Sequence, residues 1–269
     1  MATSKAPRLG GRLERTRHSL GPVARDVREL AGAWRRFQRH AVAAPSPELA
    51  PFVERYWMVS WEYDEPYRQL VVPYPNVHLT FLGGTATVRG VSSGHQYRVL
   101  AGRGSVFGVA FRPGGFRPFL GVPVSTLTDR AVPAREILPG EPPSRPDVAA
   151  VERYLRSRLP EPDPRAEEAA RIVAVVAARP TVLRVDALAR EVGLTVRGVQ
   201  RLFAEYVGVG PKWVIRRYRL REVTERLASG DAVDWAALAA ELGYADQAHL
   251  TRDFTAMFGE PPTWYAARY

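Results

Sequence analysis

The chain has 269 residues, of which 46% are hydrophobic and 25% are charged, so it is long enough for two globular domains. It contains no cysteine, which excludes disulfides, cysteine-ligated metal sites and thiol nucleophiles. The first residues lack the apolar core of a signal peptide, and no apolar run reaches the length of a membrane span. We therefore expect a soluble, cytoplasmic protein.

The net charge of +10 is concentrated near the N-terminus. Residues 1–40 hold nine Arg and one Lys against three acidic residues, whereas residues 181–269 hold eleven Arg and one Lys against eleven. Net charge concerns solubility and non-specific association, so a specific site has to be found on particular helices. We predict a basic, partly disordered tail over residues 1–45 that adds affinity without specificity, with a short docked helix over 23–37 as the alternative.

Six short runs rich in β-branched and aromatic residues lie between residues 46 and 140. Glycine, proline and asparagine separate them, as at Pro75-Asn76 and Gly83-Gly84. Several short strands with turn signals at this spacing are typical of an antiparallel barrel or sandwich. We therefore predict a β-rich domain over residues 46–140. The expected strands cover residues 56–61, 69–72, 77–82, 85–90, 97–100 and 105–111.

A proline-rich linker containing one helix is predicted over residues 141–164. Apolar residues recur at helical spacing in 148–159, directly after Asp147, which is a good N-cap residue. Asp163 and Pro164 then supply the cap and the first-turn proline of another helix. The pattern from residue 165 to residue 269 is helical throughout.

The helical region contains the same unit twice. LAREVG (188–193) matches LAAELG (238–243) at four of six positions, and FAEYVGVGPKWVIRRY (203–218) matches FTAMFGEPPTWYAARY (254–269) at six of sixteen. A repeat of this kind predicts two copies of one supersecondary unit. The residues shared by the longer segments are Phe203/Phe254, Gly208/Gly259, Pro211/Pro262, Trp213/Trp264, Arg217/Arg268 and Tyr218/Tyr269.

Each copy has the pattern of a helix-turn-helix. Ala189 and Ala239 each lie four residues before a glycine, Gly193 or Gly243. A small side chain lets two helices approach closely, and a glycine accepts the positive φ that ends the first helix. The pattern thus predicts a pair of tightly packed helices in each copy.

The second helix of each copy begins after a capping residue, Thr195 or Asp246. At about 100° per residue, its outward face can be calculated. The outward residues are Arg197, Gln200 and Arg201 in the first copy, and Ala248 and Arg252, flanked by His249 and Thr251, in the second. Arg and Gln pair bidentately with guanine and adenine edges in the major groove. Two copies that expose Arg at the same place therefore favour DNA binding.

Residues 163–269 resemble the DNA-binding domain of AraC/XylS-type transcription regulators. Phe203 lies ten positions after Gly193, Phe254 lies eleven after Gly243, and a Gly-x-x-Pro motif follows in each copy. The resemblance implies two helix-turn-helix units joined by one long helix, here about residues 212–229. Residues 46–140, notably 106–130, resemble the β-rich sensor domain of one AraC-like subgroup. The implied fold is α+β, with an N-terminal antiparallel β-barrel or cupin-like domain followed by an all-α double helix-turn-helix DNA-binding domain over residues 165–269.

The resemblance also implies roles for particular residues. Base reading would fall to Arg197, Gln200 and Arg201 in the first unit and to Gln247, Ala248, His249 and Arg252 in the second. Phosphate contacts would come from Thr195, Lys212 and Arg216. Ala248 offers only a methyl group, which suits thymine, and Arg184 stands where the first unit would take a small polar cap.

Other motifs carry less chemistry. Tyr56, Trp57, Trp61, Tyr74 and His78 either line an effector pocket or belong to the core of the β-rich domain. The five histidines offer no pair at i, i+4 spacing, so we expect no metal and no cofactor. RPGGFRP (112–118) is expected to form a tight turn. Alkyl-transfer repair proteins with an AraC-like fold use a cysteine, which is absent here, and we expect no enzymatic activity.

We therefore predict a sequence-specific transcription regulator that reads two adjacent major grooves under the control of an N-terminal sensor domain. The alternative is a small-molecule-binding module that acts mainly through protein contacts. A cupin-like enzyme is a third hypothesis, disfavoured by the absent metal ligands. The predicted partners are double-stranded DNA and RNA polymerase, but no membrane. A small-molecule effector and a second copy of the chain are left open.

Overall fold

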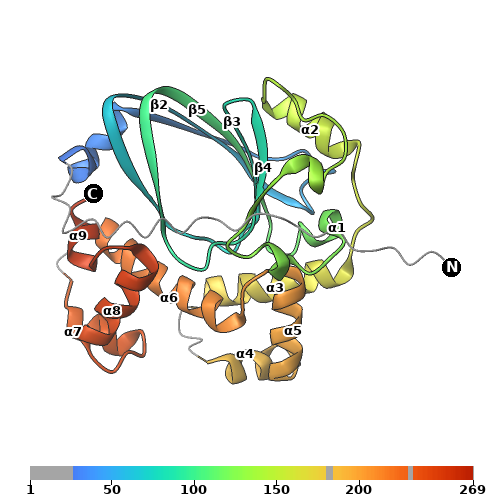
Figure 1. The fold of residues 1–269 in the computed structure, drawn as a ribbon. Helices are drawn as coiled ribbons and strands as arrows, with labels where there is room; N and C mark the ends of the chain where they lie inside the picture. Colours follow the sequence, from blue (N-terminus) through green and yellow to red (C-terminus); the bar gives the residue numbers. More distant parts are fainter. Residues whose placement is uncertain (1–26, 180–183, 230–232, 269) are drawn as a thin grey trace.

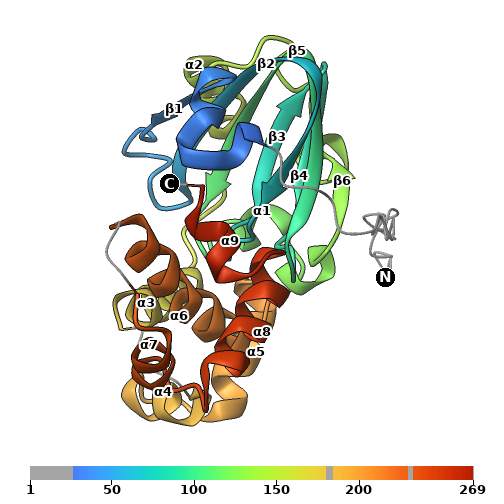
Figure 2. The ribbon, with the colours of Figure 1, turned by 90° about the vertical axis from the view of Figure 1, so that its left-hand side faces the viewer.

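The protein has a sheet-containing part and a helical part, stacked on one another (Figure 1). The structure, a computed structural model, describes residues 27–179, 184–229 and 233–268. Helices α3 to α9 gather below the sheet, and the second view shows the same two layers from the side (Figure 2). Within the described residues, no helix is long and apolar enough to cross a membrane.

The sheet is antiparallel, as predicted, and has the strand order β1-β2-β5-β3-β4-β6. Among the described residues, β1 and β6 each pair with one neighbour, so the sheet is bent but does not close into the expected barrel. The predicted α+β class holds, because the helical part follows the sheet in the chain. The strands are β1 (Gln38–Ala43), β2 (Val53–Val71), β3 (His78–Leu82), β4 (Thr85–Arg89), β5 (Gln96–Phe111) and β6 (Ala131–Pro133).

The two longest strands each join two of the predicted ones. β2 contains 56–61 and all but the last residue of 69–72, and β5 contains both 97–100 and 105–111. β2 and β5 pair with one another along nearly their whole length, with a register shift between Tyr63 and Tyr67. The shift absorbs the polar residues between the predicted strands, because a bulge lets a ladder continue past an irregular segment.

Part of the segment predicted as a basic tail belongs to the fold. Val27–Arg36 form a 3-10 helix, η1, and the residues that follow form the edge strand β1. The backbone N–H groups of Ala31 and Gly32 donate to the carbonyls of Ala267 and Arg268, both at 2.9 Å. η1 therefore lies against the C-terminal end of the chain (Figure 1). Residues 1–26, which hold the rest of that predicted tail, lie outside the described residues.

The predicted linker helix is α2 (Val148–Arg156), capped by the Asp147 carboxylate, which accepts from the N–H of Ala150. Asp163 caps the next helix in the same manner, with Pro164 at its first position. Short helices α1 (Arg117–Leu120), η2 (Val124–Leu127) and η3 (Ala134–Glu136) follow β5. The remaining helices are α3 (Pro164–Ala178), α4 (Val185–Glu191), α5 (Val196–Tyr206), α6 (Pro211–Ala228), α7 (Trp235–Glu241), α8 (Gln247–Phe258) and α9 (Pro262–Ala266).

Each part has its own hydrophobic core. One face of the sheet packs against η2, η3 and α2. A second cluster joins α3, α4, α5 and the start of α6, and a third joins the rest of α6 to α7 and α8. Within RPGGFRP, Gly114 has φ +89° and lies so close to the Ala166 carbonyl that a Cβ would meet it at 2.6 Å. This segment is thus the predicted tight turn, packed against the start of α3.

Candidate functional site

Two helix-turn-helix units occupy the helical part, α4 with α5 and α7 with α8. Gly193 and Gly243 follow the first helix of each unit with φ of +68° and +71°, the left-handed conformation that glycine accepts readily. Ala189 and Ala239 are 2% and 1% exposed. These small side chains let the second helix cross closely over the first, as the sequence pattern predicts.

The second helices start where the capping residues predict. The Thr195 hydroxyl accepts from the N–H of Gly198 at 3.0 Å, and the Asp246 carboxylate accepts from the N–H of His249 at 2.6 Å. The apolar faces of both helices are buried. All seven residues predicted to read bases are exposed, and they are Arg197, Gln200 and Arg201 on α5 and Gln247, Ala248, His249 and Arg252 on α8.

Their position in each helix suits a role in recognition. All seven lie in the first half of α5 or α8, the part of a recognition helix that contacts base edges in helix-turn-helix proteins. The C-terminal half of α5 instead packs towards the sheet, where Arg117 forms an ion pair with Glu205 at 2.6 Å. The guanidinium groups of Arg197, Arg201 and Arg252 have no hydrogen-bond or ion-pair partner among the described residues.

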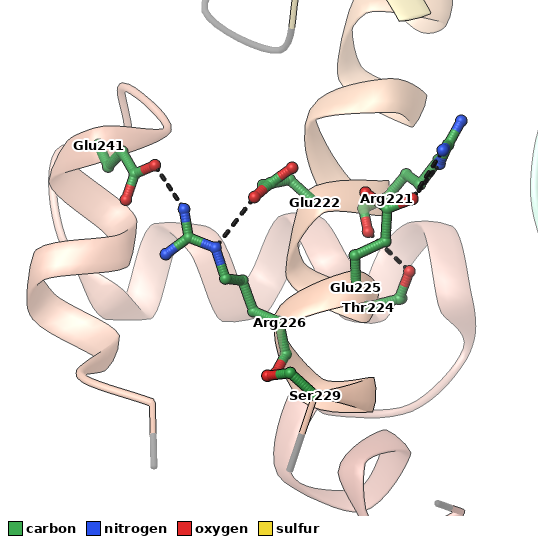
Figure 3. A network of polar contacts seen from close by, with 7 residues as sticks. All are labelled: Arg221, Glu222, Thr224, Glu225, Arg226, Ser229 and Glu241. Atoms are coloured by element: carbon green, nitrogen blue, oxygen red, sulfur yellow. Dashed lines mark hydrogen bonds and ion pairs between the residues drawn. The ribbon is translucent and has the colours of Figure 1, made fainter. Parts of the chain in front are cut away.

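The 18-residue helix α6 joins the two units. In Figure 1, α5 and α8 lie towards opposite ends of α6, and Figure 2 shows both of them on the same side. Arg226 near the end of α6 bonds to Glu222 at 3.0 Å and reaches across to Glu241 of α7 at 2.7 Å (Figure 3). This ion pair ties the joining helix to the second unit.

The three residues predicted to contact phosphates differ in exposure and in the partners they already have. Lys212 is exposed in the first turn of α6 and has no partner among the described residues. Thr195 uses its hydroxyl as the cap of α5. Arg216 forms an ion pair with Asp253 of α8 at 2.8 Å, and the Tyr244 hydroxyl donates to the same carboxylate at 2.8 Å. Arg216 therefore also holds α8 against α6.

The sheet-containing part contacts both units at equivalent glycines. The hydroxyl of Thr128 donates to the carbonyl of Gly208, which lies two residues after the end of α5. Gly259, which directly follows α8, lies against the imidazole of His95, where a Cβ would be only 2.7 Å from Cδ2. Both glycines have positive φ. The turns after α5 and α8 are thus two of the points at which the sheet-containing part contacts the helical part.

A second repeated position also docks on the N-terminal part. Arg217 of α6 is 2% exposed, donates from Nε to the carbonyl of Pro73 at 2.6 Å, and lies 4.0 Å from the centre of the Tyr74 ring. Arg268, its equivalent in the second copy, pairs with Glu29 of η1 at 2.8 Å and with Glu260. Sequence reasoning assigned no role to these arginines, although the repeat itself marked both positions.

A cavity of about 500 Å³ lies on the face of the sheet opposite the main core. Four of the five predicted pocket residues line it, namely Trp57, Trp61, Tyr74 and His78. Tyr56 does not, because side chains alternate along a strand and Tyr56 points into the core, with its hydroxyl 3.3 Å from Glu152. Residues 72–74, at one end of the cavity, contact α6 through Arg217.

The cavity is electropositive. Arg55, Arg89 and Arg98 line it, and no acidic residue does so within the described part of the chain. Burial and the nearby charge of Arg98 lower the pKa of Arg89 to about 10. Burial, followed by the charges of Arg55, Arg98 and Arg89, lowers the pKa of His78 to about 4. His78 is therefore neutral at pH 7, and its Nδ1 accepts from the Trp57 indole at 3.2 Å.

The described residues hold no cluster of three or more His, Asp or Glu side chains that could bind a metal ion. A larger hollow of about 1250 Å³ lies between β1, β2, β3 and residues 141–149. Its lining mixes basic residues such as Arg39 and Arg145 with acidic ones such as Glu141 and Asp147.

Two family models match the chain, one in each part. Residues 188–268 match the model described as "Helix-turn-helix domain", which spans both units. Residues 41–133 match the model described as "Domain of unknown function (DUF6597)", which spans most of the sheet. A comparison with curated proteins finds no match.

Solved structures of AraC-type regulators are similar to parts of the chain. A transcriptional regulator with an AraC-type DNA-binding domain from Chromobacterium violaceum is 22% identical, over 36% of this chain and 87% of that one, with a TM-score of 0.33. A probable AraC family regulator from Rhodopseudomonas palustris is 26% identical over 36% and 92%, with a TM-score of 0.32. ToxT from Vibrio cholerae is 8% identical over 86% and 98%, with a TM-score of 0.40. Overlaps this weak transfer no ligand and no partner.

Two helix-turn-helix units on one joining helix, preceded by a β-rich domain, define a DNA-binding transcription regulator with an N-terminal domain. The match over residues 188–268 supports the helix-turn-helix assignment, and the resemblance of this part to AraC-type DNA-binding domains agrees with it.

Proposed function

We propose that one chain reads two consecutive major grooves on one face of DNA, with α5 in one groove and α8 in the next. The observation that carries this proposal is the presence, on the same side of α6, of two recognition helices whose first halves are polar and exposed (Figure 2). Grooves on one face of B-DNA recur about every 34 Å, and the rigid helix α6 keeps the spacing of the two units constant.

The base-reading roles follow from side-chain chemistry. Arg197, Arg201 and Arg252 would pair with guanine, and Gln200 with adenine. Ala248 would contact the methyl group of thymine or no base at all. Lys212, Arg216 and Thr195 would contact phosphates, which position the protein without reading sequence.

Footprinting on a duplex selected from a random library tests this reading. The expected result is protection of two half-sites, one helical turn apart, by a single chain. Protection of only one half-site per chain would contradict it. A chain that selects no sequence at all would favour the alternative, a small-molecule-binding module that acts mainly through protein contacts. RNA polymerase and a second copy of the chain are further predicted partners, and the footprinting experiment does not test them.

We infer further that the β-rich domain controls how the two units are placed. Its contacts fall on the equivalent positions of both units, Gly208 and Gly259, and on Arg217 and Arg268. A change in this domain therefore acts on both recognition helices together. Because Tyr74 lines the cavity and stacks on Arg217, an occupant of the cavity would reach α6 directly.

Two conservative variants test this control. Thr128→Val removes the hydrogen bond to Gly208, and Glu29→Gln removes the charge that pairs with Arg268. Each should keep the half-site sequences but tolerate a one-base-pair change in their spacing. Thr126→Val is the matched control, because its hydroxyl bonds only to Pro123 in the same loop. An unchanged spacing preference in both test variants would refute control through these contacts.

A further inference from the structure

The cavity in the β-rich domain contains positive charge that nothing in the described chain neutralises. Arg98 has no hydrogen-bond or ion-pair partner among the described residues, and Arg89 donates only from Nε, to the Thr80 hydroxyl at 3.2 Å. Arg55, by contrast, is paired with Glu54. Partly buried charges are normally paired, because desolvation disfavours an isolated ion. Two guanidinium groups that share one cavity without an acid form a site for an anion.

Two indole rings also line the cavity. Trp57 and Trp61 lie two positions on either side of Val59 on β2, and each indole crosses a glycine on β5, Gly108 or Gly104. A Cβ at either glycine would overlap the indole, so each ring lies directly over the glycine of the neighbouring strand. Their N–H groups are already used, by His78 Nδ1 at 3.2 Å and by the Ala101 carbonyl at 3.3 Å. The rings therefore offer apolar faces and no free donor.

We propose that the cavity binds a small carboxylate with a flat, apolar ring system, its carboxylate held by Arg89 and Arg98 and its ring lying on Trp57 and Trp61. The volume of about 500 Å³ is within the range that small-molecule sites occupy. The charge of the ligand would replace the missing counter-ion, and aromatic stacking would orient its body. The neutral state of His78 adds no competing charge in the cavity.

The proposal rests on the control function proposed above, since it names the class of occupant through which that control would act. Tyr74 lines the same cavity and stacks on the buried Arg217 of α6. A ligand bound here therefore lies next to the joining helix of the two DNA-reading units.

Calorimetric titration of the full chain with three probes tests the ligand class. The probes are 2-naphthoate, its neutral amide 2-naphthamide, and acetate, which has the charge without the ring. We expect the acid to bind at least about 10-fold more tightly than the amide, as charge-assisted hydrogen bonds allow, and far more tightly than acetate. Equal affinity for acid and amide, equal affinity for naphthoate and acetate, or no binding of naphthoate would each overturn the proposal.

Variants place the binding at these residues. Arg98→Gln should weaken 2-naphthoate about 10-fold and leave 2-naphthamide unchanged, while Trp57→Leu should weaken both probes alike. Arg103→Gln is the matched control, because Arg103 lies on the same strand with a side chain that is 80% exposed. Arg89→Gln repeats the test if Arg98→Gln lowers the melting temperature. Full affinity for 2-naphthoate in the Arg variants would overturn the assignment.

Selection of DNA from a random library, carried out with the same protein samples, distinguishes failure of the ligand proposal from failure of the proposed DNA-reading function. If 2-naphthoate does not bind but the chain still selects a DNA sequence, only the ligand proposal is overturned. If the chain binds the acid but selects no sequence, the proposed DNA-reading function fails while the ligand class stands.

Discussion

The two helix-turn-helix units have the same backbone plan but use their polar residues differently. In the first unit, Arg197, Gln200 and Arg201 are exposed on α5 and engage no other described residue. In the second, Arg252 is the one arginine on the outward face of α8, while Asp253 beside it is tied to Arg216 and Tyr244. The exposed face of α5 thus carries two arginines where that of α8 carries one, and α8 is held against α6 by the ion pair between Arg216 and Asp253.

The units also differ at the start of their first helix. The Asp234 carboxylate accepts from two backbone N–H groups of α7, at 3.0 Å each. Arg184, at the same position before α4, makes no capping bond and pairs with Asp186 instead. The two units therefore keep the same helix packing although different polar residues precede their first helices. Buried apolar residues position these helices, and the exposed residues determine what each helix contacts.

The largest expected effect is the loss of unfolding free energy when a large side chain is removed from the core of either unit. Phe203 and Phe254 occupy equivalent positions, both fully buried, in separate clusters. Phe203→Ala and Phe254→Ala should each cost about 3–5 kcal/mol of unfolding free energy. Hydrogen exchange should show the loss mainly in the unit that carries the substitution. Equal loosening of both units by either variant would show that the clusters are not independent.

The next effect concerns DNA recognition. Arg201→Ala and Arg252→Ala should each cost about 1–3 kcal/mol on the selected site and relax specificity at separate base pairs, one per half-site. Selection of sites by each variant measures this. Arg190→Ala is the control, because Arg190 is exposed on α4 and pairs with Asp186. A uniform loss of affinity across all sequences from Arg201→Ala would mean that α5 is docked in another orientation.

A smaller effect is expected at the caps. Asp234→Ala should lower the free energy of unfolding by about 1 kcal/mol, because two N–H groups of α7 lose their acceptor. Arg184→Ser should act in the opposite direction and stabilise α4. Thermal unfolding of both variants checks the comparison, and a stabilising Asp234→Ala would contradict the assignment of the cap.

The smallest effect is on the salt dependence of binding. Lys212→Ala should reduce the slope of log affinity against log salt by about 0.9, if Lys212 neutralises one phosphate. Arg216→Ala should reduce it less, because Arg216 is already paired with Asp253. Titration on selected and random duplexes measures both slopes. An unchanged slope for Lys212→Ala would remove that residue from the set of phosphate contacts.

Local features of the sequence determined the helix-turn-helix units. The positive φ of Gly193 and Gly243, the small Ala189 and the cap at Thr195 all act within a few residues, so the pattern alone places the helices and their exposed faces. The density of aromatic residues between positions 56 and 74, together with His78 in a predicted strand, led to five predicted pocket residues, and four of them line the cavity. Tyr56 was included with them because the expected pocket ignored strand alternation.

Only the tertiary structure decided how the parts meet. The joining of predicted strands into β2 and β5, the edge strand β1 within the predicted tail, and the open sheet all depend on pairing between distant segments. Arg217 finds its partner in Pro73 and Arg268 finds one in Glu29, far away in the chain. Arg89 and Arg98 became a site only when folding brought them into one cavity without an acid. Such contacts leave no periodic signal, because they join residues whose separation in sequence is unrelated to any helical or strand repeat.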